Sequence, residues 1–168
     1  EKVDVPESAA KRLAARMMGA FFGLAREVRA SGIVSIGDLD MAVETALVVK
    51  PPFRFMNGVG VAEALRLVRE YAAGHDGFKV AGALERQAAS GKPWHVPFVF
   101  REDVGDVAIV TVRRPAVLNA LNATVLSQIA DVFGGIKTDG SIVGAVLTGF
   151  GTRAFVSGAD VNELAGLE

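Results

Sequence analysis

The pattern of hydrophobic and polar positions changes once along this chain. From the N-terminus to about residue 92, apolar residues recur at three- and four-residue spacing, which predicts amphipathic helices. From Phe98 onward they alternate or form short unbroken runs, which predicts strands and a connecting helix. The segment 93–97 has a proline at each end and no period, which indicates a linker. The expected fold is of the α+β class in two parts, an all-α bundle over residues 1–92 and an α/β part over residues 98–168.

The first predicted helix carries two apolar stripes side by side. A capping signal at Asp4 marks its start and Gly32 marks its end. One stripe consists of Leu13, Met17, Phe21, Leu24 and Val28. The second stripe consists of Ala14, Met18, Phe22 and Ala25. The Met and Phe side chains are expected in a core rather than in a binding site. Because a bundle of this size cannot bury both stripes by itself, we expect a homo-oligomer formed through the helical part.

Capping and helix-breaking residues divide the rest of the helical part. Ser35 is a capping residue for a helix that extends to about Leu47, and Pro51-Pro52 stops that helix. Further helical faces follow over about residues 61–72 and 79–89. The acidic residues of this part are predicted to be a cap and solvated faces, since no second acid is placed to form a catalytic pair. These residues are Asp38, Asp40, Glu63 and Glu70.

The α/β part is predicted to contain three strands and one helix. Residues 98–100 and 107–112 are the first two predicted strands, joined by a turn. Asn122 is placed to cap a helix over about residues 124–136. The unbroken apolar run over residues 142–147 is typical of a parallel strand that is buried on both faces. Strand, helix and strand then form one crossover unit.

Composition narrows the range of partners. The formal net charge of −1 gives no basis for binding nucleic acid or an anionic membrane surface. The absence of cysteine excludes disulfides, thiolate nucleophiles and cysteine-based metal sites, and it suits a reducing compartment, so we expect a cytoplasmic location. No apolar stretch reaches the roughly 20 residues of a membrane-spanning helix, and no metal site is expected. The two histidines, His75 and His95, are expected to face solvent.

Two motifs in the α/β part point to chemistry. Residues 114–121 have the sequence R-P-A-V-L-N-A-L, and residues 154–160 have the sequence A-F-V-S-G-A-D. In the second motif a glycine-containing loop leads into a helix that is predicted to begin near Asp160. Backbone N–H groups at a helix start have no partner within the helix, so they can hold an anionic oxygen. Together the motifs resemble the N-terminal part of the enoyl-CoA hydratase/isomerase (crotonase) family, with its R-P-x-x-x-N-A-L followed by A-F-x-x-G-A-D.

The crotonase resemblance implies an acyl-CoA thioester as the substrate. It implies that the backbone N–H of Ala159 is one of two donors to the thioester oxygen. The residues that it assigns to binding the CoA thioester are Ala116, Val117, Leu118, Ser157, Gly158 and Asp160. Where many relatives have a lysine soon after G-A-D, this chain has Asn162, so the resemblance does not extend to that charged contact with the CoA phosphates. The family's second donor and its two acid/base glutamates lie beyond Glu168.

The helical part contains a second set of motif residues, over about residues 10–75. They are Arg16, Gly32, Ser35, Asp38, Asp40, Pro52, Phe53, Val59 and Gly60. Their order and spacing resemble the C-terminal domain of 3-hydroxyacyl-CoA dehydrogenases, whose pattern is V-N-R, then G-x-x-S-x-x-D-x-D, then G-P-F and V-G. Ala15 replaces the active-site asparagine of that pattern, and Pro51 replaces the glycine of G-P-F. The resemblance therefore implies a degenerate second repeat.

A dehydrogenase repeat followed by a crotonase domain resembles the fused dehydrogenase/hydratase enzymes of fatty-acid β-oxidation. This resemblance implies that the chain is the central piece of a longer bifunctional enzyme, with NAD bound by an upstream domain that is absent here. The chain alone is then expected to be inactive. The alternative is a non-catalytic scaffold, or a segment for acyl-CoA binding and oligomerisation. Glutamates at the family positions after Glu168 in the parent reading frame would favour the enzyme.

Overall fold

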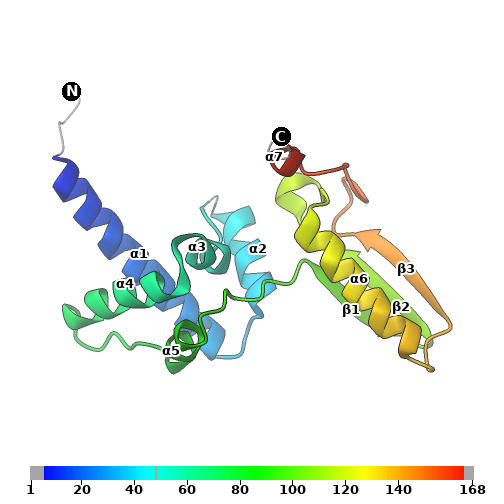
Figure 1. Ribbon diagram of the computed structural model, residues 1–168, viewed down its shortest axis with the longest axis horizontal. Coiled ribbons are helices and arrows are strands. Elements are labelled where there is room, and N and C mark those ends of the chain that lie inside the picture. The colour runs from blue at the N-terminus through cyan, green and yellow to red at the C-terminus, as the bar shows by residue number, and fades with distance from the viewer. Residues whose placement is uncertain (1–5, 48, 165–168) are drawn as a thin grey trace. The chain divides into compact units, whose positions relative to one another are not determined.

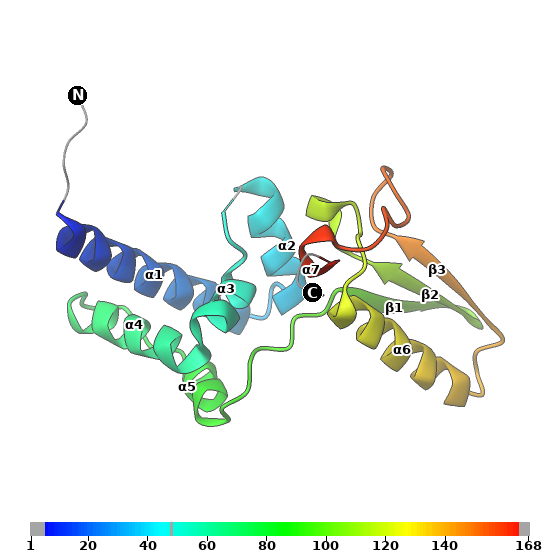
Figure 2. The ribbon, with the colours of Figure 1, turned by 45° about the horizontal axis from the view of Figure 1, so that its top comes forward.

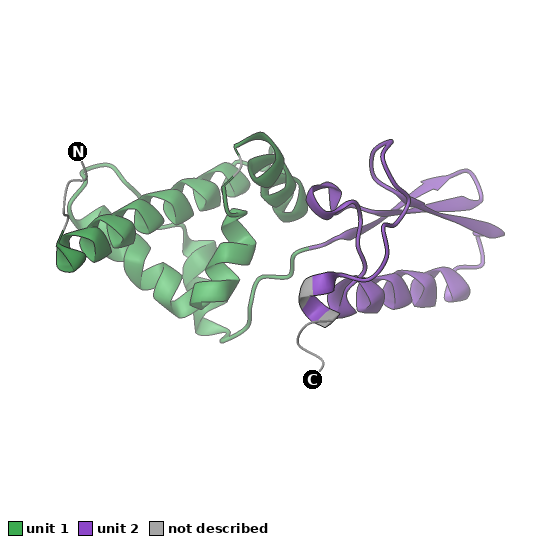
Figure 3. Ribbon diagram, turned by 90° about the horizontal axis from the view of Figure 1, so that it is seen from above, with its two compact units in different colours: residues 1–96 green, residues 97–168 purple. Residues whose placement is uncertain are grey.

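The computed structural model describes residues 6–47 and 49–164, and the chain divides into two compact units (Figure 3). Unit 1 comprises Glu1–Val96 and unit 2 comprises Pro97–Glu168. Among the described residues, unit 1 contains helices and no strand, whereas unit 2 contains a three-stranded sheet with helices. The chain therefore combines helical and mixed α/β structure.

Unit 1 packs its helices around an apolar core. The helices are α1 (Glu7–Ala30), α2 (Ile36–Ala46), α3 (Pro52–Val59), α4 (Val61–Ala73) and α5 (Gly82–Ala89) (Figure 1, Figure 2). The long helix α1 lies beside α4, and both α3 and α5 contact this pair. The largest fully buried apolar side chains of the unit are Phe22, Phe53, Met56, Leu84 and Val68. Unit 1 therefore has a hydrophobic core of its own.

Two glycines allow α1 to approach its neighbours closely. A Cβ atom added at Gly19 would lie 2.4 Å from the carbonyl oxygen of Leu67 on α4. A Cβ atom added at Gly23 would lie 2.3 Å from the ring of Phe78. Since both distances are far shorter than real Cβ contacts, another residue at Gly19 would push α1 away from the backbone of α4, and another residue at Gly23 would displace the ring of Phe78.

Unit 1 buries one stripe of α1 and exposes most of the other. Phe22 and Ala25 of the second stripe are 0% and 7% exposed. In the first stripe, Leu13, Met17 and Leu24 are 60%, 64% and 52% exposed. The prediction that this bundle cannot bury both stripes by itself is confirmed for the described residues. The exposed side chains leave an apolar surface along α1.

The helix starts of unit 1 use different capping groups. Ser35 caps α2 as predicted, because its Oγ accepts the backbone N–H of Asp38 at 3.1 Å. Helix α1 begins at Glu7 with Pro6 at the cap position and has no side-chain cap. The predicted cap, Asp4, lies outside the described residues. The described start of α1 therefore depends on the fixed backbone of proline rather than on a side-chain hydrogen bond.

The prediction of a solvated face does not hold for Asp40, which is 1% exposed. Its Oδ1 accepts the N–H of Phe53 at 2.7 Å, and its Oδ2 accepts the N–H of Arg54 at 3.0 Å. Both donors lie at the start of α3, whose own N-cap residue, Pro51, provides no side-chain cap. Burial raises the pKa of Asp40 above its ordinary value, although these hydrogen bonds and the charge of Arg54 oppose the rise. Asp40 is thus a buried cap supplied by another helix.

Unit 2 contains the strands β1 (Val99–Val104), β2 (Val107–Val112) and β3 (Gly144–Gly149), in the order β1-β2-β3 (Figure 1). Helix α6 (Ala123–Thr138), the short helix η1 (Pro115–Val117) and α7 (Val161–Leu164) complete its described part. Strands β1 and β2 are antiparallel, with Val99 opposite Val112. Strands β2 and β3 are parallel, with Val112 opposite Gly149. The predicted strand–helix–strand unit is therefore present, and β1 is longer than predicted.

The core of unit 2 lies between α6 and the first two strands. Val99, Val110 and Val112 are buried against Val125 of α6. Asn122 caps α6 as predicted, because its Oδ1 accepts the N–H of Val125 at 3.0 Å. Side chains of α6 that complete this core are Ile129, Val132, Phe133 and Ile136.

The prediction that the third strand is buried on both faces is wrong. The strand is Gly144–Gly149, and its side chains Val146 and Leu147 are 49% and 36% exposed. The reason is that α6 packs against β1 and β2, and that β3 pairs with β2 alone among the described residues. Strand β3 is therefore an edge strand of the described sheet.

Candidate functional site

The predicted site residues lie on two loops of unit 2. The first loop (residues 114–121) follows β2, and the second loop (residues 150–160) follows β3. Because β2 and β3 are parallel neighbours, the two loops begin side by side at the C-terminal ends of these strands. The second loop packs tightly over the end of β3, since a Cβ atom added at Gly149 would lie 2.1 Å from the carbonyl oxygen of Phe155. Motifs far apart in the sequence thus meet in space.

Backbone hydrogen bonds hold the two loops against each other. The N–H of Ser157 donates to the carbonyl of Leu118 at 3.1 Å. Leu121 donates its N–H to the carbonyl of Gly158 at 2.9 Å and accepts the N–H of Asp160 at 2.7 Å. The structure therefore places four of the predicted site residues, namely Leu118, Ser157, Gly158 and Asp160, at one junction.

The side chain of Asn119 fastens the same junction from inside. It is 1% exposed. Its Oδ1 accepts the N–H of Arg114 at 2.9 Å, while its Nδ2 donates to the carbonyls of Phe150 at 3.1 Å and Ala154 at 2.9 Å. The backbone at Leu118 and Asn119 has φ values of 50° and 59°, in the left-handed region that asparagine tolerates better than most residues. One side chain therefore fixes the shape of both loops.

A buried ion pair provides a second cross-link. The Nη2 of Arg114 donates to the Oδ2 of Asp160 at 2.8 Å, and the two side chains are 10% and 11% exposed. The Nη1 of Arg114 also donates to the carbonyl of Ala120. Asp160 therefore holds the second loop against the first. Its expected contact with CoA stays a prediction.

Ala159 lies at the solvent-facing side of the junction. Its bridge to Leu121 is parallel, and the hydrogen bonds of Leu121 go to the residues before and after Ala159. The N–H of Ala159 consequently points away from Leu121. No described residue accepts this N–H, and the residue is exposed. A rigidly held backbone donor of this kind is what stabilisation of an oxyanion requires.

The other predicted contact residues form the rim of this junction. Ala116, Val117, Ser157 and Gly158 are exposed, whereas Leu118 is partly buried. The Oγ of Ser157 donates to the carbonyl of Val117 at 3.3 Å. A cavity of about 240 Å³ lies between the first loop and the start of the second. The rim and the cavity offer a surface for an extended ligand.

The acidic side chains near Ala159 have structural partners. Asp160 pairs with Arg114, and Glu163 accepts the N–H of Ala123 at the start of α6 at 2.9 Å. Within residues 6–47 and 49–164 there is no group of three or more metal-ligating side chains. In the same ranges no helix is both long and apolar enough to cross a membrane. The described site therefore provides a hydrogen-bond donor and a binding surface, without a pair of carboxylates for acid/base catalysis.

The sequence analysis missed two positioning residues, Arg114 and Asn119. Both belong to the R-P-A-V-L-N-A-L motif, so the signal was available. Their function becomes visible only when the second loop is in place, because their partners Phe150, Ala154 and Asp160 all lie on it. The signal was a polar residue within a largely apolar motif, because a polar side chain that becomes buried needs hydrogen-bond partners.

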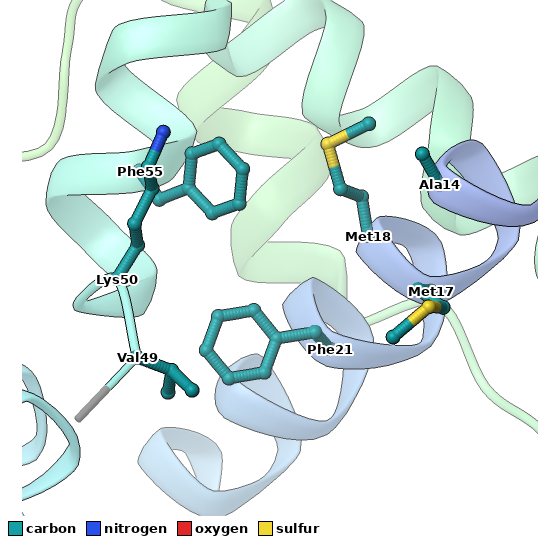
Figure 4. A pocket seen from close by; sticks show the side chains of 7 residues that line it. All are labelled: Ala14, Met17, Met18, Phe21, Val49, Lys50 and Phe55. Carbon is teal, nitrogen blue, oxygen red and sulfur yellow. The ribbon is translucent and has the colours of Figure 1, made fainter. Parts of the chain in front are cut away.

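Unit 1 contains a separate apolar cavity of about 420 Å³ (Figure 4). Its lining residues are Ala14, Met17, Met18, Phe21, Val49, Lys50 and Phe55. Phe21 and Met18 point into the space opposite Phe55 (Figure 4). The expectation of a core position holds for Phe22 and is wrong for Met17, which is 64% exposed. The cavity continues the exposed stripe of α1.

Comparisons with known proteins show which proteins the second unit is similar to. Residues 102–168 match the family Enoyl-CoA hydratase/isomerase. The chain is 44% identical over 66 residues to the short-chain-enoyl-CoA hydratase of Clostridium acetobutylicum, which covers 39% of this chain and 25% of that protein. It is 44% identical over 59 residues to the 2,3-dehydroadipyl-CoA hydratase of Escherichia coli, which covers 35% and 23%. An enoyl-CoA hydratase structure from Thermoplasma volcanium matches with 37% identity and a TM-score of 0.39, over 42% of this chain and 28% of that one.

The crotonase assignment of unit 2 is thus supported for residues 102–168. The chain spans about a quarter of the length of the curated relatives that it matches. Both motifs that carry the resemblance, and all the predicted site residues, lie within the matched segment.

Proposed function

We propose that unit 2 is the N-terminal part of a hydratase/isomerase domain that acts on acyl-CoA thioesters, with the Ala159 N–H as one donor to the thioester oxygen. The observation that carries this proposal is the unpartnered, outward-pointing N–H of Ala159 at a junction held by Asn119 and Arg114. The family match and the two hydratase relatives support the substrate class.

The proposed role of Ala159 follows from the charge that develops during hydration. When water adds to the double bond beside a thioester, negative charge builds on the thioester oxygen. A fixed N–H stabilises that charge in the transition state, and losing one such donor costs roughly 3 kcal/mol. The exposed rim at Ala116, Val117, Ser157 and Gly158, with the partly buried Leu118, would bind the CoA part. Asp160 contributes through Arg114 by keeping the loop that carries Ala159 in place.

The described residues near Ala159 supply one donor and no carboxylate pair, since Asp160 and Glu163 already have structural partners. We therefore propose that hydration needs a longer crotonase domain and that this chain alone is inactive. The share of about a quarter of each relative's length supports this part of the proposal.

A fused dehydrogenase is the finer part of the proposal. Its support is the motif order of the helical part, in which Ser35 and Asp40 act as helix caps. The motif therefore accounts for the fold of unit 1 rather than for a nicotinamide site. The sequence has no strand followed by G-x-G-x-x-G, so the residues of this chain do not fit NAD.

We also propose that the exposed stripe of α1 and the adjoining cavity form the contact to a second copy in a cytoplasmic protein (Figure 4). Leu24→Asp is expected to abolish this contact at micromolar concentration, because it charges an exposed apolar surface. Arg12→Gln, also on α1, is the control. Sedimentation that shows a monomer for the unaltered chain would contradict this part.

The alternative function is a non-catalytic scaffold or an acyl-CoA-binding and oligomerisation segment. The exposed apolar surface of α1 favours it, because such a surface serves contact and not chemistry. In that case crotonyl-CoA would bind to the chain, and the longer protein would not hydrate it.

The test uses crotonyl-CoA and follows the loss of enoyl absorbance. In the longer protein, Ala159→Pro removes the N–H and is expected to lower the hydration rate by roughly a hundredfold or more. Thr124→Ala, at an exposed position of α6 outside this site, keeps every backbone N–H and is the control, which should change the rate little. An unchanged rate in the Ala159→Pro protein would show that the N–H of Ala159 is not a donor to the thioester oxygen. A rate of the 168-residue chain within about a hundredfold of the longer protein would contradict the proposed inactivity.

A further inference from the structure

Arg26, on α1 of unit 1, is a buried cation that has no counter-charge among the described residues. Its side chain is 4% exposed. Its Nε is buried without a hydrogen-bond partner, and no described residue forms a hydrogen bond or ion pair with its guanidinium. Because a charge that leaves water needs compensating partners, this position requires an explanation.

Two aromatic rings flank Arg26. They stabilise its charge but leave its hydrogen-bond donors without acceptors. The guanidinium carbon lies 4.6 Å from the ring centre of Trp94 and 5.6 Å from that of Phe53. Ring faces attract a cation but accept none of its hydrogen bonds in the normal geometry. The Nε1 of Trp94 is a second buried donor without a partner. Two unsatisfied donors therefore occur on side chains in contact, and both call for an acceptor.

The position of Trp94 is fixed by hydrogen bonds rather than by packing alone. Its backbone N–H donates to the Oδ1 of Asn57 at 2.7 Å, and its carbonyl accepts the Nδ2 of Asn57 at 2.9 Å. Trp94 also meets Phe53 edge to face, with ring centres 5.3 Å apart. The aromatic surroundings of Arg26 are thus held in place by hydrogen bonds and ring packing.

The charged groups near Arg26 are also cations. Arg29 follows it by three residues on α1, so the two side chains lie on the same face of that helix, and α5, which carries Arg86, contacts α1. Burial lowers the pKa of Arg26, and the guanidinium groups of Arg29 and Arg86 lower it further. Arg29 and Arg86 lie in the last turns of α1 and α5, where the helix dipole favours positive charge. This explains their presence at the surface. It does not explain why a third arginine is buried beside them.

We propose that Arg26, Arg29 and Arg86 form a binding site for a phosphate group beside Trp94. Guanidinium groups match phosphate oxygens with paired hydrogen bonds, and several positive charges favour a doubly charged phosphate over a carboxylate. The site lies in unit 1 and is independent of the acyl-CoA site proposed for unit 2. The bound phosphate supplies the missing negative charge and the missing acceptors.

The chain contains a single tryptophan, Trp94, so its fluorescence reports on this site directly. The 168-residue chain is titrated with sodium phosphate and, at equal ionic strength, with sodium chloride. We expect a saturable change in fluorescence with phosphate and not with chloride. Arg26→Met should abolish it, and the double variant Arg29→Gln with Arg86→Gln should weaken binding about tenfold. Arg12→Gln, which removes an exposed charge elsewhere on α1, should leave binding unchanged.

A free phosphate ion and a phosphate group on a larger ligand are distinguished by a second titration. CoA and dephospho-CoA differ by one phosphate monoester, so a change in Trp94 fluorescence with CoA alone identifies an ester-bound phosphate. If Arg26→Met does not fold, the double variant Arg29→Gln with Arg86→Gln decides, because Arg29 is half-buried and Arg86 is exposed. The proposal is overturned if the unaltered chain shows no phosphate-specific saturation, or if the double variant binds phosphate as well as the Arg12→Gln control.

Discussion

Asp40 in unit 1 and Asn119 in unit 2 are both polar residues that are 1% exposed, and the two have different functions in the fold. In unit 1, Asp40 accepts backbone N–H groups that are 13 and 14 residues away, at the start of α3. In unit 2, Asn119 donates to the carbonyls of Phe150 and Ala154, which are 31 and 35 residues away. The first side chain completes a helix within a bundle that has its own apolar core. The second, together with backbone hydrogen bonds and the Arg114–Asp160 ion pair, holds two loops against each other.

This difference shows where each unit is vulnerable. Unit 1 is stabilised mainly by the burial of large apolar side chains, so the loss of one polar contact affects one helix start. The loops of unit 2 depend on a small number of polar cross-links, and the N–H of Ala159 is oriented by them. A single substitution can therefore remove the site while leaving the sheet folded.

The largest effect is expected for Asn119→Ala. It leaves the Arg114 N–H and two carbonyls without partners, and it puts alanine at a φ of 59°. We expect a loss of about 4 kcal/mol in the stability of the loop junction. Hydrogen exchange of the amides of residues 150–160, measured by mass spectrometry, should become much faster.

Asn122→Ala is the matched control for this substitution. Asn122 lies three positions further along and makes a local cap with Val125. Its loss should cost about 1 kcal/mol and affect the start of α6 without opening the second loop. Equal effects of the two substitutions on residues 150–160 would contradict the special role given to Asn119.

Much of this contrast follows from how far a sequence pattern reaches. Helices α1, α2, α4 and α5 of unit 1 and the cap Asn122 were predicted because periodicity and capping act within a few residues. Helix α3 was not predicted. The role of Asn119 was not predicted because its partners belong to a loop after another strand. The exposure of Val146 was missed for a similar reason, since an apolar run does not show which neighbours cover it.

For the predicted site, the sequence indicated the two motifs and the residues within them that the crotonase resemblance assigns to the site, including Ala159. The sequence did not indicate that Asp160 forms an ion pair with Arg114, since the two residues are 46 positions apart. In unit 1 the two stripes were recognised, but the choice of the buried stripe depends on α4 and Phe78, which pack against Gly19 and Gly23.

Gly149→Ala tests whether the second loop depends on shape as well as on Asn119. The added Cβ would lie 2.1 Å from the carbonyl oxygen of Phe155 and 2.7 Å from the Nδ2 of Asn119. We expect a loss of about 2–3 kcal/mol, because the backbone of the loop must move. In Gly134→Ala on α6 the new Cβ meets nothing within 4 Å, so this control should gain about 0.5–1 kcal/mol. Urea unfolding followed by circular dichroism measures both.

Asp40→Ala makes the corresponding test in unit 1. It leaves the N–H groups of Phe53 and Arg54 without an acceptor at the start of α3. We expect a loss of about 2 kcal/mol, within the range for helix caps, while the apolar core keeps the helices in place. Trp94, which packs against Phe53, should report the change by fluorescence during urea unfolding. An effect larger than that of Asn119→Ala would reverse the comparison between the units.

The smallest effect is expected from pH at the exposed end of unit 2. The Ser141 hydroxyl, and then Arg101, lower the pKa of Asp139 to about 2 from its ordinary value of 3.8. A carboxyl whose pKa is lower in the folded state stabilises that state above the unfolded pKa, and this contribution is lost as the pH falls through the folded pKa. The contribution of Asp139 should therefore be complete at pH 5 and should decline toward pH 2.

The check compares the unaltered chain with Asp139→Asn in urea at several pH values between 5 and 2. Asparagine carries no charge at any of them, so the difference in midpoint between the two proteins should be small at pH 5 and should close as the pH falls. It should be small because Asp139 and Arg101 are 32% and 24% exposed, and exposed pairs are weak. A difference that stays constant over this range would mean that the charge of Asp139 contributes nothing and that only its hydrogen bonds to Ser141 matter.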